Sequence, residues 1–195
     1  TFQRKILPWQ SIDLKDDDGK ASSLGASELI ALDKTQKVAQ GRQELIVVAT
    51  LLQKIPNFAG LTRTAEIFNA SKLILPTMDI VKDKAFKDIA VTADQWIPIE
   101  AVTEADLPAW LKSQRSAGFS LIGVEQTSNS VSLVGYEFPK KTVLLLGEEK
   151  HGIPVELIQM LDQCVEIPQL GIIRSLNVHV SASIMIWEYT KQQLE

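Results

Sequence analysis

The stretch TVLLLGEEKHGIP, residues 142–154, joins an uninterrupted apolar run to a turn that is rich in charge. A continuous run such as Val143 to Leu146 is typical of a strand covered on both faces, as in a parallel sheet. The turn between Gly147 and Gly152 holds two carboxylates, a lysine and a histidine. Parallel sheets bind their ligands just beyond the carboxyl ends of the strands. The stretch therefore predicts a buried parallel strand with a ligand site at its end.

Outward from this stretch, strand-like apolar runs alternate with helical segments. The expected strands are 45–51, 72–75, 97–102, 120–125, 142–146 and 164–167. A helix is expected after Thr103, because Asp106 follows at capping-box spacing and Gly118 supplies a left-handed stop. Further helices are expected to start near Thr62 and at Pro154, and a last one is expected from about 176 to 192. Strands that alternate with helices predict an α/β fold, a mostly parallel sheet flanked by helices.

The first 42 residues differ in composition from the rest of the chain. They contain the acidic segment KDDDGK and the small-residue segment ASSLGAS. This composition predicts that 1–42 is an extension or linker, with a short helix around 27–37, and that 43–195 is a single domain. The chain begins with Thr1 rather than Met, as a piece cut from a longer protein or a processed chain would.

The cysteine content and the apolar runs bear on the compartment. Cys164 is the single cysteine, which excludes a disulfide framework and favours a reducing environment. No apolar run approaches the ~20 residues needed to span a bilayer, and the first residues lack a signal peptide's apolar segment. A soluble protein of the cytoplasm or nucleus, with no membrane partner, is expected.

The net charge of −4 is unevenly distributed along the chain. Residues 79–106 hold seven acids and three lysines, so this segment carries the whole excess and the remainder is neutral. Phosphate neutralisation dominates most nucleic-acid binding. We therefore expect only modest affinity for any nucleic acid from this chain alone, with further binding surface supplied by a dimer or by a missing N-terminal region.

The sequence lacks the motifs of several common kinds of site. After Gly147 and Gly152 come Ile153 and Pro154, where a P-loop requires lysine and a hydroxyl residue, and no G-x-G-x-x-G occurs. His151 lies beside two glutamates, but no H-E-x-x-H is present and His179 is the only other histidine, so no metal is expected. No G-x-S-x-G elbow is present to support a hydrolase triad. The turn instead suits a polar, stacked cofactor held by backbone groups.

The last expected helix is apolar on two faces. Val178, Ala182, Met185 and Tyr189 form one face, and Val180, Ile184 and Trp187 form another. A helix with two apolar faces needs two partners. One is expected to be the sheet and the other a second copy of the chain, which predicts a homodimer.

Three strand ends are followed by glycine-containing motifs. They are Asn57, Gly60 and Arg63; Gly147, Glu149, Gly152 and Ile153; and Ile167, Pro168, Gly171, Ser175, Leu176 and Asn177. With these motifs in this order over residues 45–192, the sequence resembles the SpoU (TrmH-type) branch of the SPOUT RNA methyltransferases.

The resemblance implies a SPOUT fold with a C-terminal trefoil knot, a homodimer and S-adenosylmethionine as the cofactor. It implies methylation of a tRNA ribose 2′-hydroxyl, with a D-loop guanosine (guanosine-18) as the expected acceptor. The cofactor-binding residues that it implies are Glu125, Leu146, Gly147, Gly152, Ile167, Ser175 and Leu176. The residues that it implies at the reacting ribose are Asn57, Arg63, Glu149, Ser175 and Asn177.

Elementary chemistry restricts the roles of two of these residues. Methyl transfer needs an in-line approach of the hydroxyl oxygen, so positioning is the main task of the site. Arg63 does not lose its proton in a protein, and its fork of donors suits an RNA phosphate better than a role as a base. Either Glu149 accepts the hydroxyl proton or solvent takes it late.

Simpler explanations exist for single residues. Asn57 follows Pro56 and can form an Asx turn, Glu149 can cap the helix that begins near Pro154, and Ser175 can be the N-cap of the last helix. His179 has no expected role. For the whole chain, the competing hypothesis is a non-catalytic RNA-binding or scaffolding module that has a methyltransferase fold, and a small-molecule methyltransferase is a third possibility.

Overall fold

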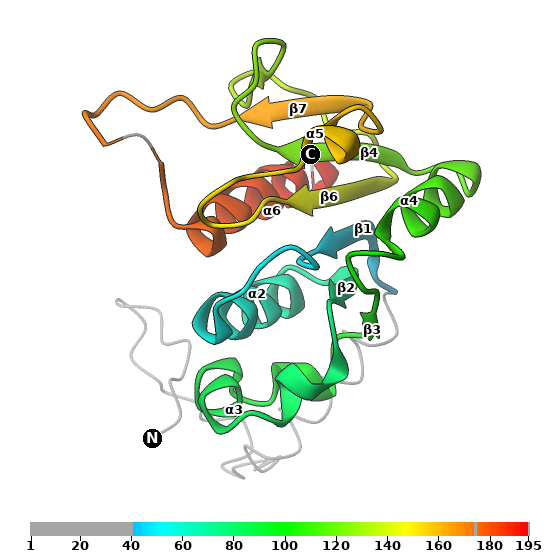
Figure 1. The fold of residues 1–195 in the computed structure, drawn as a ribbon, viewed down its shortest axis with the longest axis vertical. Coiled ribbons are helices and arrows are strands. Elements are labelled where there is room, and N and C mark those ends of the chain that lie inside the picture. The colour runs from blue at the N-terminus through cyan, green and yellow to red at the C-terminus, as the bar shows by residue number, and fades with distance from the viewer. Residues whose placement is uncertain (1–40, 174, 195) are drawn as a thin grey trace, which may run out of the picture. The chain divides into compact units, whose positions relative to one another are not determined.

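The computed structural model describes residues 41–173 and 175–194, and within them seven strands form one sheet (Figure 1). The strand order is β3-β2-β1-β6-β4-β7-β5, and every adjacent pair is parallel. The strands are β1 (Gln43–Val48), β2 (Ala70–Leu75), β3 (Ile99–Ala101), β4 (Ser120–Val124), β5 (Val131–Ser132), β6 (Thr142–Leu146) and β7 (Gln163–Glu166). The predicted mostly parallel α/β sheet is confirmed.

Five α-helices and two short 3-10 helices lie in the described residues. They are α2 (Ile55–Ile67), α3 (Lys84–Ala90), α4 (Leu107–Ser116), α5 (Val155–Ile158) and α6 (Val178–Leu194), with η1 (Met78–Lys82) and η2 (Ala93–Gln95) on either side of α3. No helix among the described residues is long and apolar enough to cross a membrane.

Side chains of alternate residues along the central strands enter two separate cores, because successive residues of a strand point to opposite faces. Leu45 and Val47 pack in one core with apolar residues of α2, α3 and α6. Ile46 and Val48 pack in the other with apolar residues of α4 and α5. The sheet is therefore covered on both faces, with α2 and α6 on the same one (Figure 1).

The position of β6 explains why the apolar run of residues 142–146 has no polar face. All five residues of β6 are buried, and the strand pairs with β1 on one side and β4 on the other. The carboxyl ends of β1, β4, β6 and β7 lie at the same edge of the sheet because the strands are parallel. The segments that follow these four strands can therefore meet.

The start of α2 differs from the expected helix start near Thr62. The helix begins at Ile55, directly after the extended Lys54, and Pro56 lies in its first turn. Proline is well tolerated there because the first amides of a helix have no partner inside the helix. Asn57 is consequently a helical residue, and an Asx turn in a loop is the wrong interpretation.

Two other local features differ from the expected elements. Thr103 and Asp106 do pair, with the Asp106 amide donating to Thr103 Oγ1 over 3.3 Å, but α4 starts only at Leu107. Strand β5 was not predicted, because its two residues are exposed and carry no apolar run.

The expected extension over 1–42, with its helix around 27–37, lies outside the described residues except for its last two. The trefoil knot stays a prediction.

Candidate active site

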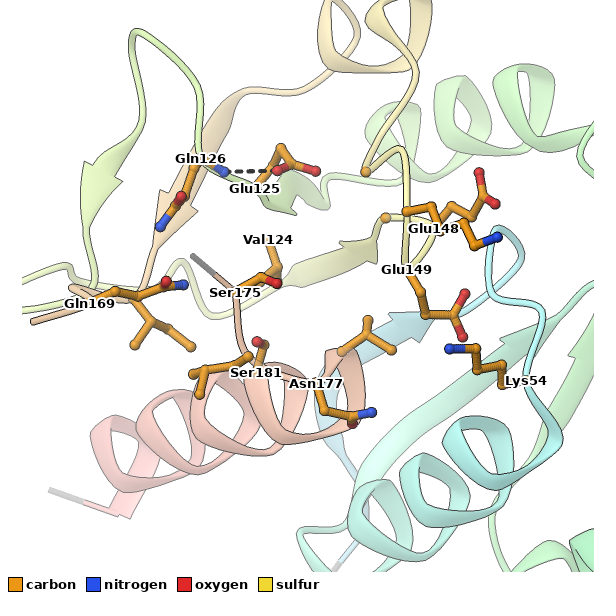
Figure 2. A pocket seen from close by; sticks show the side chains of 16 residues that line it. Lys54, Val124, Glu125, Gln126, Glu148, Glu149, Gln169, Ser175, Asn177 and Ser181 are labelled. Atoms are coloured by element: carbon orange, nitrogen blue, oxygen red, sulfur yellow. Dashed lines mark hydrogen bonds between the residues drawn. The ribbon is translucent and has the colours of Figure 1, made fainter. Parts of the chain in front are cut away.

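A cavity of about 470 Å³ opens at the carboxyl edge of the sheet (Figure 2). Its lining comes from the segments that follow β1, β4, β6 and β7 and from the first turn of α6. The lining residues are Lys54, Val124, Glu125, Gln126, Gly147, Glu148, Glu149, Lys150, Gly152, Ile167, Gln169, Ser175, Leu176, Asn177, Val178 and Ser181. A volume of this size is typical of small-molecule and cofactor sites.

The glycine turn after β6 forms one wall of the cavity. Glu148 and Gly152 exchange two backbone hydrogen bonds of 2.9 Å, which fold the turn back on itself. A Cβ atom on Gly147 would lie 2.6 Å from the Gly152 carbonyl carbon, and one on Gly152, at φ +71°, would collide with Glu125 Oε2. The two backbones can approach this closely because residue 147 is glycine, whereas residue 152 must be glycine because of its positive φ and the adjacent Glu125 carboxylate.

Glu125, at the end of β4, fastens the turn to the sheet. Its Oε2 accepts a hydrogen bond of 3.0 Å from the Ile153 amide, and its Oε1 accepts one from the Gln126 amide, which Figure 2 draws. This carboxylate was expected only as a cofactor-binding group. In the structure it also holds the glycine turn in place.

Three side chains from distant parts of the chain form a hydrogen-bonded row beside the cavity. Asn57 Nδ2 donates to Glu149 Oε1 over 2.8 Å, and Asn177 Nδ2 donates to Asn57 Oδ1 over 3.0 Å. Asn57 is buried in the first turn of α2, whereas Glu149 and Asn177 line the cavity. The row fixes the amide orientation of Asn57, because its nitrogen must face the carboxylate and its oxygen must face Asn177.

The environment of Glu149 keeps its carboxylate charged. Burial raises the pKa of this carboxyl, but hydrogen bonds from its own backbone, from the Asn57 side chain and from the backbones of Gln53 and Lys54 lower it by more. The pKa of Glu149 therefore lies below its ordinary value of 4.5. At neutral pH the group is an ionised hydrogen-bond acceptor.

Asn177 also caps helix α6. Its Oδ1 accepts hydrogen bonds from the amides of His179 and Val180, at 2.9 and 3.3 Å. The suggested N-cap, Ser175, lies two residues too early, and it lines the cavity instead. The side chain of Asn177 thus has two functions, since its oxygen caps the start of the helix and its nitrogen reaches Asn57.

Most of the predicted site residues lie together. Six of the seven predicted cofactor-binding residues line the cavity, namely Glu125, Gly147, Gly152, Ile167, Ser175 and Leu176. The seventh, Leu146, is fully buried at the end of β6 and lines no part of the cavity. Arg63 is exposed on α2, is not part of the lining, and has no hydrogen bond or ion pair from its side chain to any other described residue. The roles of both residues stay predictions.

The structure adds residues that the motifs did not reveal. Lys54 precedes α2 and points toward Glu149 at the rim of the cavity, as Figure 2 shows, and Lys150 lines the cavity from the glycine turn. Neither lysine belongs to the family motifs, and solvated surface is the default expectation for such residues. The position of Lys54 just beyond a parallel strand was a usable signal, because such positions border ligand sites.

The charges of the lining match an amphoteric ligand. Glu125, Glu148 and Glu149 offer carboxylates to a positive group, and Lys54 and Lys150 offer ammonium groups to a negative one. Ile167 and Leu176 add an apolar surface. The lining can therefore accept a ligand that carries a cationic group, an anionic group and an apolar surface. Among the described residues no group of three or more His, Cys, Asp or Glu could hold a metal ion.

The fold and the site place the chain among the parallel α/β proteins that bind a ligand at the carboxyl ends of their strands. Comparison with known families identifies the class more closely. The chain belongs to the SpoU rRNA Methylase family, which matches residues 44–187.

Two eukaryotic relatives cover much of the chain. A mouse (Mus musculus) protein named tRNA (guanosine(18)-2′-O)-methyltransferase TARBP1 is 46% identical over 192 residues, which is 98% of this chain and 12% of that protein. A Saccharomyces cerevisiae tRNA (guanosine(18)-2′-O)-methyltransferase is 40% identical over 154 residues, which is 78% of this chain and 11% of that protein. The chain thus matches only 12% and 11% of the length of these two relatives.

Solved structures support the same family. The Aquifex aeolicus TrmH/SpoU tRNA modifying enzyme superposes with a TM-score of 0.72 at 26% identity, over 84% of this chain and 85% of that one. An AdoMet-bound rRNA methyltransferase from Sinorhizobium meliloti gives a TM-score of 0.69 at 28% identity, over 77% and 57% of the two chains. The predicted family is confirmed.

Proposed function

We propose that the protein is an S-adenosylmethionine-dependent tRNA ribose 2′-O-methyltransferase that acts on guanosine-18. The observation that carries the proposal is the row Glu149–Asn57–Asn177, which borders the strand-end cavity in a chain of the SpoU family. The names of the mouse and yeast relatives support tRNA and guanosine-18 as the substrate. A non-catalytic RNA-binding module is the alternative that the experiment below tests.

In this proposal the cavity holds S-adenosylmethionine, which supplies an electrophilic methyl group on a positive sulfur. Ile167 and Leu176 would contact the flat base of this cofactor, and the backbone of the glycine turn would hold its polar groups. The carboxylates of Glu125 and Glu149 favour a cationic ligand over a neutral one. These assignments rest on the lining residues and on a structural relative that is described as AdoMet-bound.

The polar row suggests how the acceptor ribose is oriented. Asn177 and Ser175 lie at the cavity and can hydrogen-bond a ribose hydroxyl, while Glu149 holds Asn57 and Asn57 holds Asn177. A general base works best when its pKa lies near the operating pH. Because the pKa of Glu149 is lowered, its carboxylate is a weak base, and we assign it to positioning. The hydroxyl proton would then be lost to solvent rather than to Glu149.

Arg63 is proposed to bind the RNA backbone rather than to transfer a proton. Its guanidinium is exposed and unpaired among the described residues, and it lies on the same helix as Asn57. The two residues are six positions apart, which is less than two turns and about 9 Å along the helix axis. A guanidinium that starts from this position can hold a phosphate next to the reacting nucleotide, with Lys54 and Lys150 adding positive charge at the cavity rim.

A homodimer through α6 is proposed from the second apolar face of this helix. Ala182, Met185 and Tyr189 are buried against the sheet, as expected. Of the three residues predicted for the other face, Val180 is 44% exposed and Trp187 is 48% exposed, whereas Ile184 packs against the core. The ring centroid of Trp187 lies 5.6 Å from that of Phe68. An apolar surface of this kind commonly forms symmetric contacts.

The test combines cofactor titration with methyl transfer. Calorimetric titration with S-adenosylmethionine or its demethylated product is expected to give one site per chain. Tritium transfer is then measured with unmodified tRNA and with tRNA that already carries a 2′-O-methyl group on guanosine-18, which is expected to accept none.

Matched variants locate the activity in the cavity. Asn177→Ala is expected to abolish transfer, whereas Asn129→Ala, which removes an exposed loop asparagine side chain, is expected to leave it unchanged. Cofactor binding without transfer to any tRNA, also in a longer chain, would favour the non-catalytic module.

A further inference from the structure

His179 joins the first turn of α6 to helix α2. Its ring Nε2 lies 2.9 Å from Thr64 Oγ1, and Thr64 Oγ1 lies 3.3 Å from Ser183 Oγ. Ser183 in turn donates to the His179 carbonyl over 2.8 Å. The amide of His179 donates to Asn177 Oδ1, so the same residue also takes part in the helix cap.

The ring of His179 packs directly against Gly60. A Cβ atom on Gly60 would lie 2.5 Å from His179 Cε1 and 2.6 Å from Nδ1. Real Cβ atoms do not approach other atoms this closely. Gly60 is therefore required inside α2 by the ring of His179, although glycine normally weakens a helix interior.

These contacts lie close to the polar row along both helices. Gly60 and Thr64 follow Asn57 by one and two turns along α2, and His179 follows Asn177 by two residues. Burial lowers the pKa of the His179 ring, and a backbone hydrogen bond with Gly60 opposes this effect only in part. A neutral ring offers one donor and one acceptor, which suits a contact between a backbone group and a hydroxyl.

We propose that His179 is a positioning residue, which fixes the first turn of α6 against α2 and so holds Asn177 at Asn57. It lines no part of the cavity and is assigned no contact with a reacting group. The inference rests on the proposed methyl transfer, because it names the residue that keeps Asn57 and Asn177 correctly placed for the acceptor ribose. Small displacements of such groups are costly, since a misplacement of about 1 Å can reduce turnover ~100-fold.

The test is a double-mutant cycle between His179 and Gly60. Gly60→Ala and His179→Ala are each expected to reduce kcat about tenfold or more, with the Kd of S-adenosylmethionine changed less than about threefold. The kcat of the double variant is expected to be higher than the two single reductions multiplied together would give. The reason is that the methyl group added at position 60 then occupies the space left by the ring. Additive effects would overturn the steric part of the inference.

Two further variants separate packing from hydrogen bonding. His179→Gln can still reach Thr64 and is expected to recover part of kcat, whereas His179→Leu fills a similar volume and is expected not to. Equal recovery by both variants, or wild-type kcat in His179→Ala, would overturn the positioning role.

A spectroscopic readout keeps the inference independent of the proposed activity. Side-chain amide resonances of Asn57 and Asn177 are recorded in the wild type and in His179→Ala. We expect both to shift, which supports the inference even if the wild type methylates no tRNA. Unchanged resonances would overturn it, whereas a wild type without transferase activity would overturn the proposed function alone.

Discussion

Asn177 Nδ2 donates a hydrogen bond of 3.0 Å to Asn57 Oδ1, across 120 positions of sequence. The same Asn177 side chain caps α6 through its oxygen, so the orientation of its amide is set by the helix that it begins. The orientation of the Asn57 amide is set in turn by its hydrogen bond to Glu149, 92 positions away. The geometry of the proposed ribose site thus depends on a chain of contacts among three elements.

Removal of Asn57 should break the row at its centre. In Asn57→Ala the Glu149 and Asn177 groups each lose a partner, and we expect the free energy of unfolding to fall by about 1–3 kcal/mol. Turnover should fall more than cofactor affinity, because Asn57 does not line the cavity. Urea unfolding and single-turnover transfer measure the two effects. Asn57→Asp should lower the free energy of unfolding and the turnover more than Asn57→Ala does, because it places a second carboxylate beside Glu149. The reverse order would contradict this account.

The lowered pKa of Glu149 predicts a pH-dependent contribution to stability. A carboxyl whose pKa is depressed in the folded state stabilises the protein above its unfolded value, here about 4.5, and the contribution is lost as the pH falls through the folded value. Wild type should therefore be more stable than Glu149→Gln at neutral pH. The difference should shrink in acid, which urea unfolding at several pH values would measure. A difference that is constant with pH would exclude a charge effect.

Arg63 should act on RNA and not on the cofactor. Arg63→Ala is expected to weaken tRNA binding and to flatten its dependence on salt by about one unit of log–log slope, since one phosphate contact is lost. Binding of S-adenosylmethionine should be unchanged. Lys112→Ala removes an exposed cation on α4, on the opposite face of the sheet, and serves as the charge-matched control. Equal effects of both variants would mean that Arg63 contributes only general charge. Wild-type turnover and tRNA affinity in Arg63→Lys would exclude the bidentate role.

The importance of glycine at position 152 can be tested by comparison with Gly118, which also has a positive φ. Both have positive φ, +71° and +89°, but a Cβ on Gly118 meets nothing within 4 Å, whereas one on Gly152 meets the Glu125 carboxylate. Gly118→Ala should cost only the backbone strain, about 1–2 kcal/mol. Gly152→Ala should cost more and should also weaken cofactor binding, because it displaces the wall of the cavity. Thermal unfolding and calorimetry compare the two, and equal behaviour would show that the contact with Glu125 is unimportant.

The exposed face of α6 predicts a concentration-dependent assembly. Trp187→Glu places a charge on this face and should convert a dimer to a monomer in sedimentation experiments, with α-helical content unchanged. Lys112→Glu on α4 is the matched control and should leave the assembly state as it is. A wild type that is monomeric at all accessible concentrations would contradict the proposed dimer.

The sequence predicted the elements well where local patterns are strong. The uninterrupted apolar run of β6 gave the observed bounds of that strand, since only a strand buried on both faces needs no polar positions. Shorter or exposed elements were harder to predict, because β5 has two exposed residues and no periodicity. Helix α2 was expected too late in the chain, since the glycine within it and the proline in its first turn both suggested a loop.

By itself the sequence determined the alternation of strands and helices, the family motifs and many residues of the cavity lining. Only the tertiary structure decided that Asn57, Glu149 and Asn177 touch, that Asn177 rather than Ser175 caps α6, and that Gly60 is required by the ring of His179. The physical reason is the range of the interactions. Apolar periodicity acts between residues that are close in sequence, whereas these contacts form only after the parallel strands bring distant loops to one edge of the sheet.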